Sequence, residues 1–177
     1  MVKINDNNIR FGREADISSI THLLNIAYRG EASKAGWTTE AHLIAGEQRA
    51  TDEMVLETFQ NPGSVFLLYQ QPEQTVSGCV NLQIHGKKIY LGMFSVSPAE
   101  QGNGIGKKLL QAAEIYARSV DCDNIYMTVI SVRTELIDWY IRHGYQDTGE
   151  RKAFEEDNIT GKHLQQLEFA VLEKPIT

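Results

Sequence analysis

One glycine-rich stretch, residues 96–110, constrains the fold of this chain more than any other. It reads Val-Ser-Pro-Ala-Glu-Gln-Gly-Asn-Gly-Ile-Gly-Lys-Lys-Leu-Leu. An apolar run over residues 88–96 leads into it. Apolar side chains then recur every three or four residues, at Ile105, Leu109, Ala112, Ala113, Tyr116 and Val120. This pattern predicts a strand that ends near Val96, a tight turn, and a helix that begins close to Gly104. The glycines permit positive φ angles and close approach of a ligand to the backbone.

The start of the predicted helix suits an anion. The first N–H groups of a helix have no partners inside it and carry the positive end of the helix dipole. Lys107 and Lys108 lie in this first turn, where the dipole disfavours cations, so we expect both lysines to face a negative group. The stretch therefore predicts a phosphate or pyrophosphate cradle. The alternative is an ordinary glycine turn with two solvated lysines.

Two common phosphate-binding patterns do not fit this turn. The dinucleotide pattern Gly-x-Gly-x-x-Gly would need its third glycine where the chain has lysine or leucine, and the triphosphatase loop would need glycine at Gln101. What remains is Gln101-x-x-Gly104-x-Gly106. It resembles the pyrophosphate-binding motif of the GNAT superfamily of acetyl-CoA-dependent N-acyltransferases, usually written [Gln/Arg]-x-x-Gly-x-[Gly/Ala].

This resemblance implies acetyl-CoA as co-substrate and no metal. It also implies that the backbone of residues 94–96 pairs with the pantetheine amides like an added strand. Gly92 would mark a bulge that separates this strand from the next one. The cofactor-binding residues that the resemblance implies are Phe94, Ser95, Val96, Gln101, Gly102, Asn103, Gly104, Ile105, Gly106 and Lys107.

A second stretch, residues 133–145, resembles the GNAT segment Leu-Tyr-x-x-x-Gly-Phe, with Tyr140 on the tyrosine and Gly144-Tyr145 on the Gly-Phe. In that family the tyrosine often lies by the thioester sulfur and protonates the leaving thiolate, whose developing charge an O–H can stabilise. The alternative is that Tyr140 is a core aromatic at helical spacing from Leu136. The superfamily often has Asn where Arg133 stands. A pantetheine contact is therefore not carried over to Arg133, which we expect to be solvated at the start of a helix.

The acceptor site must come from the N-terminal half of the chain. Where the GNAT fold covers this site, the candidates are Tyr28, Trp37, Thr38 and Glu40. An aromatic wall with a carboxylate would suit a cationic amine. The alternative is that Trp37 covers the edge of the core and Glu40 is solvated. No general base stands out: Glu40, Tyr90 and His85 are candidates, and a water chain or a neutral amine would also serve.

The coarse pattern of elements predicts an α+β fold. Predicted strands cover residues 9–12, 64–70, 75–84, 88–96, 124–130, 145–154 and 164–172. Predicted helices cover residues 16–29, 38–45, 51–61, 104–120 and 135–143, with a loop over 31–36. Three strands joined by short turns form a meander, and the strand–helix–strand unit closes right-handed with a parallel pair. We expect one GNAT-like domain, 1–177, with a mainly antiparallel twisted sheet and helices on both faces.

Composition limits the expected binding partners and cellular compartment. The 177 residues carry a net charge of −6, which argues against a general basic surface for nucleic acid. The polar N-terminus and the lack of an 18-residue apolar run argue against a signal or a membrane span. Two cysteines far apart in sequence fit reduced thiols in a cytoplasmic protein. A homodimer is left open.

Three functional hypotheses follow. The first is an N-acetyltransferase that moves an acetyl group from acetyl-CoA to a primary amine of a small molecule or peptide by direct attack in a ternary complex. The second is a non-catalytic acyl-CoA-binding or sensing domain, which needs the cradle without Tyr140. The third is a nucleotide-binding or structural module. Comparing the thermal stabilisation by CoA and by ATP should separate the third hypothesis from the first two. Amine-dependent CoA release should then separate the first from the second.

Overall fold

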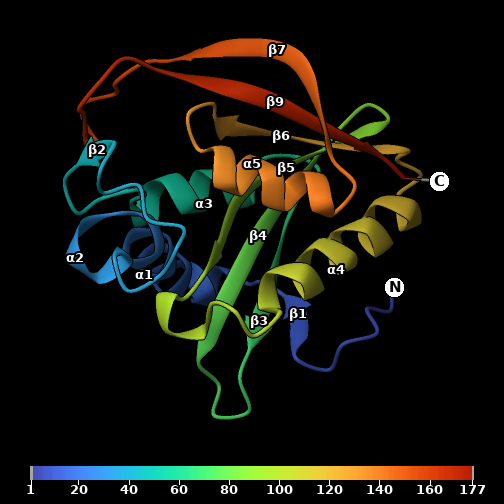
Figure 1. The fold of residues 1–177 in the computed structure, drawn as a ribbon. Coiled ribbons are helices and arrows are strands. Elements are labelled where there is room, and N and C mark those ends of the chain that lie inside the picture. Colours follow the sequence, from blue (N-terminus) through green and yellow to red (C-terminus); the bar gives the residue numbers. More distant parts are fainter. Residues whose placement is uncertain (1, 177) are drawn as a thin grey trace.

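A computed structural model describes residues 2–176, and a seven-stranded sheet forms its centre (Figure 1). The strand order is β1-β3-β4-β5-β6-β9-β7. These strands are β1 (Ile9–Phe11), β3 (Ser64–Gln70), β4 (Val76–His85), β5 (Lys88–Val96), β6 (Asn124–Ile130), β7 (Gln146–Phe154) and β9 (Leu167–Pro175). Among the described strands β5 and β6 pair in parallel, and the other neighbours are antiparallel. The predicted α+β fold with one parallel pair is confirmed.

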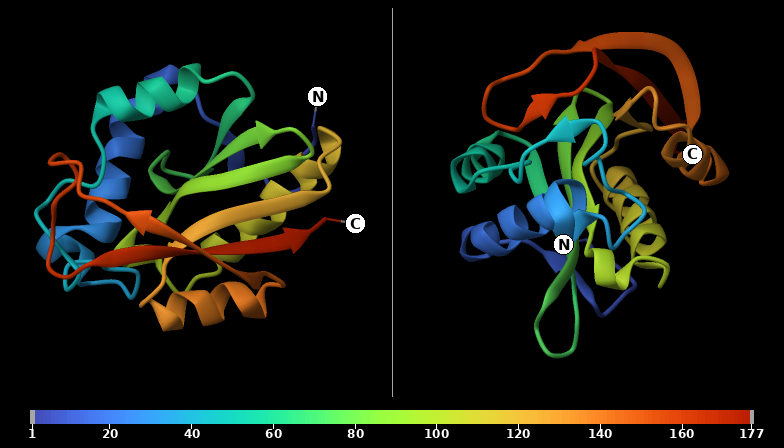
Figure 2. Two further views of the ribbon diagram at one scale, coloured as in Figure 1. Left: turned by 90° about the horizontal axis from the view of Figure 1, so that it is seen from above. Right: turned by 60° about the vertical axis from the view of Figure 1, so that its left-hand side comes forward.

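Helices cover both faces of this sheet. They are α1 (Ile17–Tyr28), α2 (Gly30–Ser33), α3 (Asp52–Gln60), α4 (Ile105–Ser119) and α5 (Thr134–Arg142). The right-hand view of Figure 2 shows α1 and α3 on one side of the sheet and α4 and α5 on the other. Adjacent residues of a strand point to opposite faces, so Phe66 and Leu68 pack under α1 and α3, whereas Leu67 packs toward α4. Within residues 2–176, no helix combines the length and apolar composition needed to cross a bilayer.

Three local predictions were wrong, and tertiary pairing is the reason at residues 44–45 and 164. The segment predicted as a helix over residues 38–45 instead ends in the short strand β2 (Ile44–Ala45), which pairs with β8 (Lys162–His163). That pairing buries Ile44 completely. The segment predicted as a loop over 31–36 overlaps α2, which runs from Gly30 to Ser33. The last strand starts at Leu167 rather than at Leu164, which is exposed and donates its N–H to Leu43.

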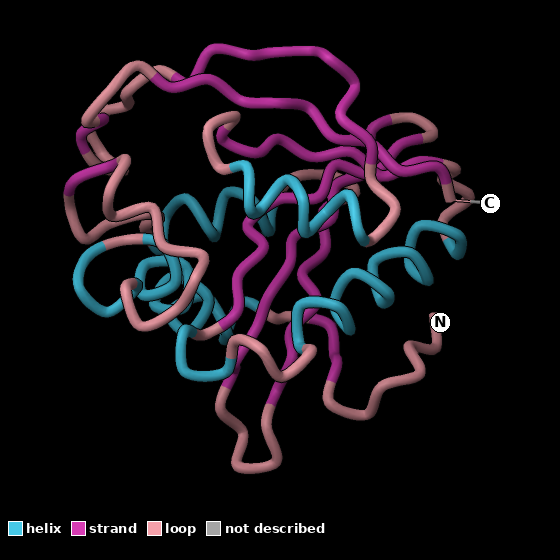
Figure 3. Tube along the Cα trace, in the orientation of Figure 1, coloured by secondary structure: helices cyan, strands magenta, loops and turns pink. Residues whose placement is uncertain are grey.

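The sheet opens between β5 and β6, and this fork positions the site. The two strands pair only from Lys88 to Tyr90. Figure 3 traces the path of all the strands in the same orientation as Figure 1. The β4–β5 register shifts between Cys79 and Asn81, whose partners are Ser95 and Gly92. Met93 has a φ of 45° at this irregularity. The predicted bulge at Gly92 is therefore present, and beyond it β5 turns away from β6.

Candidate functional site

The first part of the site is a cavity of about 470 Å³ between the start of α4 and helix α5. We call it the helix-end cavity; it is lined by residues 94–96, 100–102, 104–107 and by α5 side chains that include Trp139 and Tyr140. Nine of the ten residues predicted to bind the cofactor lie in this lining. Asn103 does not, because its side-chain amide turns to Glu100 at 3.3 Å.

The turn before α4 has the backbone that the sequence predicts. Gly102 and Gly104 have φ angles of 90° and 82°, and nothing lies within 4 Å of a Cβ built on either residue. The first intrahelical bond runs from the Lys108 N–H to the Gly104 carbonyl at 3.1 Å. The N–H groups of residues 105–107 therefore have no partner within the helix and lie at the cavity. This arrangement suits a phosphate group.

The two lysines of the first turn do not act together. Lys107 lines the helix-end cavity. Lys108 instead pairs with Asp6 at 3.4 Å, and its ammonium lies 5.5 Å from the centre of the Tyr69 ring. Consecutive helix residues point about 100° apart, so neighbouring side chains reach different surfaces. The negative group that faces Lys108 is therefore Asp6 of the chain itself, and only Lys107 of the two lines the cavity.

Strand β5 presents alternate backbone groups to the fork. The Ser97 N–H donates to Ser77 of β4 at 2.8 Å, so odd-numbered residues here pair with β4, and Phe94 and Val96 face away from it. Their carbonyls accept side-chain donors: the Tyr28 hydroxyl bonds to Phe94, and the Gln101 amide bonds to Val96 at 3.0 Å. Added-strand pairing with pantetheine, still a prediction, would therefore rely on the N–H groups of Phe94 and Val96.

Gln101 has a structural task that its motif does not reveal. Its Nε2 donates to the Thr38 hydroxyl at 2.8 Å as well as to Val96, and its Oε1 accepts from the Trp37 N–H at 2.8 Å. The side chain thus ties the segment that carries Trp37 to the end of β5. Trp37 then lies 6.2 Å from Trp139, between ring centres, at the helix-end cavity.

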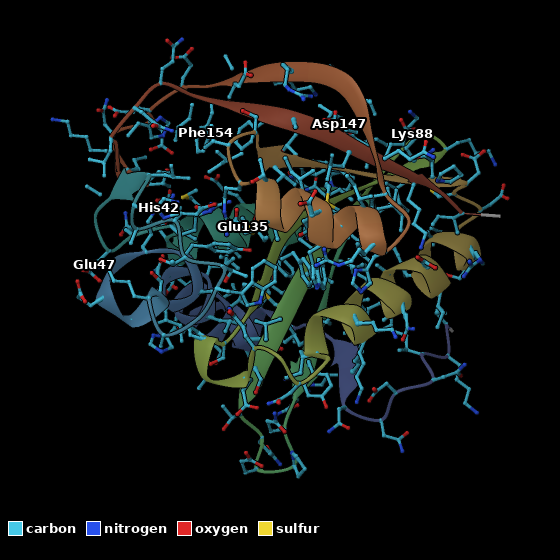
Figure 4. The ribbon with its side chains drawn as sticks, in the orientation of Figure 1. His42, Glu47, Lys88, Glu135, Asp147 and Phe154 are labelled. Atoms are coloured by element: carbon cyan, nitrogen blue, oxygen red, sulfur yellow. The ribbon has the colours of Figure 1, made fainter. Side chains whose placement is uncertain are left out.

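A second cavity, of about 210 Å³, lies where β5 and β6 diverge. We call it the fork cavity. Its walls come from the two strands, from the segments around Glu40 and Arg49, and from the β7–β9 hairpin. Figure 4 shows one of these residues, Phe154, on the hairpin, and also Glu135 at the start of α5. Four residues line both cavities and mark their junction: Tyr28, Phe94, Leu136 and Tyr140.

Tyr140 is held firmly at this junction. The residue is 5% exposed, and its ring meets Trp139 edge-on at 5.2 Å and Tyr145 at 5.8 Å between ring centres. Burial raises the pKa of its hydroxyl well above the usual value. The phenol therefore stays protonated at neutral pH and beyond. Packing and a chemical role are both compatible with this position.

Glu40 and Arg133 form a buried ion network that sequence reasoning missed. The Glu40 carboxylate bonds to Arg29 through one oxygen and to Arg133 through the other at 3.2 Å. Arg133 also donates to the Thr38 carbonyl at 2.8 Å. Arg133 is only 2% exposed, so the expectation of a solvated residue was wrong. No local pattern could have revealed the pairing, because Glu40 and Arg133 are 93 positions apart.

The candidate acceptor residues are distributed over both cavities. Trp37 and Thr38 line the helix-end cavity, Glu40 lines the fork cavity, and Tyr28 lines both. Glu40 is 8% exposed rather than solvated, and both its oxygens are engaged. The carboxylate therefore has no spare charge for a cationic amine.

The candidate bases also separate. Tyr90 lines the fork cavity, and its hydroxyl lies 3.2 Å from that of Thr128. His85 lies outside the linings of both cavities and bonds to Tyr126 at 2.6 Å. Sequence reasoning overlooked Arg49 in the fork cavity and Trp139 and His143 in the helix-end cavity. Both aromatic residues could have been found, since Trp139 directly precedes Tyr140 and His143 follows it by three positions, about one helical turn.

Comparisons with known proteins agree with this geometry. Residues 20–145 match the model of the Acetyltransferase (GNAT) family, which is more than half of the chain. A search of curated proteins finds no match.

Solved structures with the same fold include three N-acetyltransferases. The ribosomal-protein-S18-alanine N-acetyltransferase from Escherichia coli is 12% identical with a TM-score of 0.70, covering 96% of this chain and 93% of that one. An N-acetyltransferase from Staphylococcus aureus is 17% identical with a TM-score of 0.69, covering 96% and 98%. A spermidine N-acetyltransferase chimera from Vibrio cholerae is 13% identical with a TM-score of 0.67, covering 94% and 93%.

Proposed function

Because this chain belongs to the GNAT acetyltransferase family, we propose that it transfers an acetyl group from acetyl-CoA to a primary amine of a small molecule or peptide by direct attack in a ternary complex. One observation supports this most: Tyr140 lies where the helix-end cavity meets the fork cavity. A proton donor at that junction can reach a leaving group from one side while an acceptor enters from the other.

The residues around the helix-end cavity fit acetyl-CoA. The free N–H groups at the start of α4 and the Lys107 ammonium would hold the pyrophosphate, and Gly102 and Gly104 leave open space in front of the backbone. Phe94 and Val96 would pair with the pantetheine amides through the face of β5 that β6 leaves free. Acetyl-CoA, when bound, supplies a thioester whose carbonyl carbon accepts the lone pair of the amine.

The chain then has to manage two protons. The new C–N bond forms as the C–S bond breaks, and the Tyr140 hydroxyl donates its proton to the departing sulfur. Burial keeps this hydroxyl protonated until it is needed. Glu40 is paired with two arginines, so it is not available as a base. We propose that the amine reacts in its neutral form, and that the proton it loses after attack restores Tyr140 directly or through water.

The direct test has two stages. CoA should raise the melting temperature of the protein, and ATP should raise it less, because ATP lacks the pantetheine arm that would pair with β5. Acetyl-CoA mixed with a panel of amino acids, polyamines, aminoglycosides and peptides should then release free CoA with at least one amine. Stabilisation by CoA without amine-dependent release would favour the non-catalytic binding domain instead. Equal stabilisation by ATP would contradict both.

A further inference from the structure

The fork cavity is positively charged, although the whole chain carries a net charge of −6. The charged side chains of its lining are Glu40, Arg49 and Arg133. Glu40 is neutralised by Arg133 on one side and by Arg29 on the other. The balance of these four groups is two positive charges, and both arginines of the lining lie close to the space that an acceptor would occupy.

Arg49 has no ion-pair partner among residues 2–176. It is half-buried at the fork cavity. Its backbone is held in place by Asn25, whose side-chain oxygen accepts the N–H groups of Arg49 and Ala50 at 2.5 and 2.9 Å. A half-buried guanidinium on a fixed backbone, without an ion-pair partner among the described residues, is suited to an anion supplied from outside.

Arg133 supplies an independent observation. Its two terminal nitrogens bond to Glu40 and to the Thr38 carbonyl, but its buried Nε has no hydrogen-bond partner within the described chain. Leaving a buried charged donor without a partner is costly. Arg133 lines the fork cavity, so its guanidinium adds a second positive charge to the wall beside Arg49.

We infer that the acceptor carries an oxyanion, a carboxylate or a phosphonate, on the same small molecule as its primary amine, and that Arg49 and Arg133 bind this group. The inference rests on the acetyltransferase function proposed above. The amine then points to the junction at Tyr140. This inference replaces the expectation that Glu40 binds a cationic acceptor, because both oxygens of Glu40 are already bonded to arginines.

The dimensions and walls of the fork cavity define the acceptor further. Its volume of about 210 Å³ lies below the roughly 300–1,000 Å³ of pockets for drug-sized ligands. Aromatic and apolar side chains of Tyr90, Met127, Phe154 and Phe169 also line the cavity, although polar atoms make up more than half of the exposed wall. A compact amino acid or aminophosphonate fits this description better than a polyamine or a long peptide.

The test compares acceptors that differ only in charge. L-Amino acids, their carboxamides and the matching aminoalkylphosphonates are offered to the wild type, Arg49→Ala and Arg49→Lys. The acids should exceed their amides in kcat/KM by at least about tenfold. Arg49→Ala should raise KM for the acids by about 10- to 100-fold and leave KM for the amides within about twofold. Arg49→Lys should recover part of the loss. The carboxylate and phosphonate arms identify which oxyanion is preferred.

The matched control is Arg118→Ala. Arg118 is an exposed arginine on α4 outside both cavities, and it should behave as wild type. Amides used as well as acids, or an Arg49→Ala defect of equal size for both, would overturn the inference while leaving the acetyltransferase function intact.

A readout without turnover separates the two proposals. Calorimetric titration of the CoA-loaded protein with N-acetylated acids and with N-acetylated amides measures the preference for charge even if no amine releases CoA. Tighter binding of the acids, lost in Arg49→Ala, would support the oxyanion site alone. Equal binding of acids and amides would refute it.

Discussion

The buried network around Glu40 gives the sharpest prediction about stability. Glu40→Gln keeps the shape of the side chain and removes its charge. The side chains of Arg29 and Arg133 are each 1% exposed, so two guanidinium groups would remain buried without a counter-charge. The amide of the new side chain would also direct a donor at one of them, where the carboxylate had accepted a bond.

The magnitude follows from that burial. Removing one partner of a buried ion pair costs about 3–5 kcal/mol in the free energy of unfolding. For a domain of this size, each kcal/mol lowers the melting temperature by about 2–4 °C, so Glu40→Gln should melt about 6–20 °C below the wild type. Chemical denaturation monitored by tryptophan fluorescence gives the same free energy independently.

A matched control shows whether burial is the cause. Asp147 on β7 (Figure 4) forms a comparable 2.9 Å ion pair with Arg151, but the two side chains are 32% and 38% exposed. Asp147→Asn should therefore cost at most about 1 kcal/mol. If Glu40→Gln loses no more than Asp147→Asn, the network does not stabilise the fold, and our account of its burial is wrong.

Four further predictions concern the site. Tyr140→Phe should lower kcat by about 10- to 10³-fold with unchanged acetyl-CoA affinity. The control Tyr145→Phe removes a buried hydroxyl without a partner, so it should keep wild-type turnover and keep or gain stability. Wild-type turnover in Tyr140→Phe, with chemistry rate-limiting, would make Tyr140 a core aromatic only. Lys107→Ala should weaken CoA binding in a calorimetric titration, but Lys108→Ala should not, because Lys108 pairs with Asp6; equal losses would show that both lysines face the cofactor. Gly104→Ala should weaken CoA binding and cost about 1–2 kcal/mol from its φ of 82°, while Gly149→Ala, with a φ of 83° on remote β7, should cost the same stability and leave CoA binding unchanged. Because burial raises the pKa of Tyr140 well above 10, the phenol keeps its proton, so kcat/KM should rise with pH as the amine deprotonates and show no fall up to about pH 9.5. A falling limb near pH 8 would point to another acid.

The sequence by itself determined those parts of the site that depend on local geometry. Strand periodicity, a glycine-dense turn and helical spacing are written in neighbouring residues, so the turn over residues 102–104 and the helix after it were predictable. The same holds for the bulge at Gly92, which the β4–β5 register confirms. Tyr140 lines both cavities, and its role near the reacting atoms stays a prediction.

The tertiary structure decided everything that depends on distant residues meeting. Helical geometry places Lys107 at the cavity, but only the packing of the N-terminal segment gives Lys108 a partner in Asp6. The pairing of β2 with β8 overrode a local helix prediction at Ile44. Glu40 lies 93 positions from Arg133, and a charge read in isolation gives no indication of whether folding will bury it beside an opposite charge or leave it in water. For this reason the sequence suggested a free carboxylate for the acceptor, whereas the folded chain pairs Glu40 with two arginines.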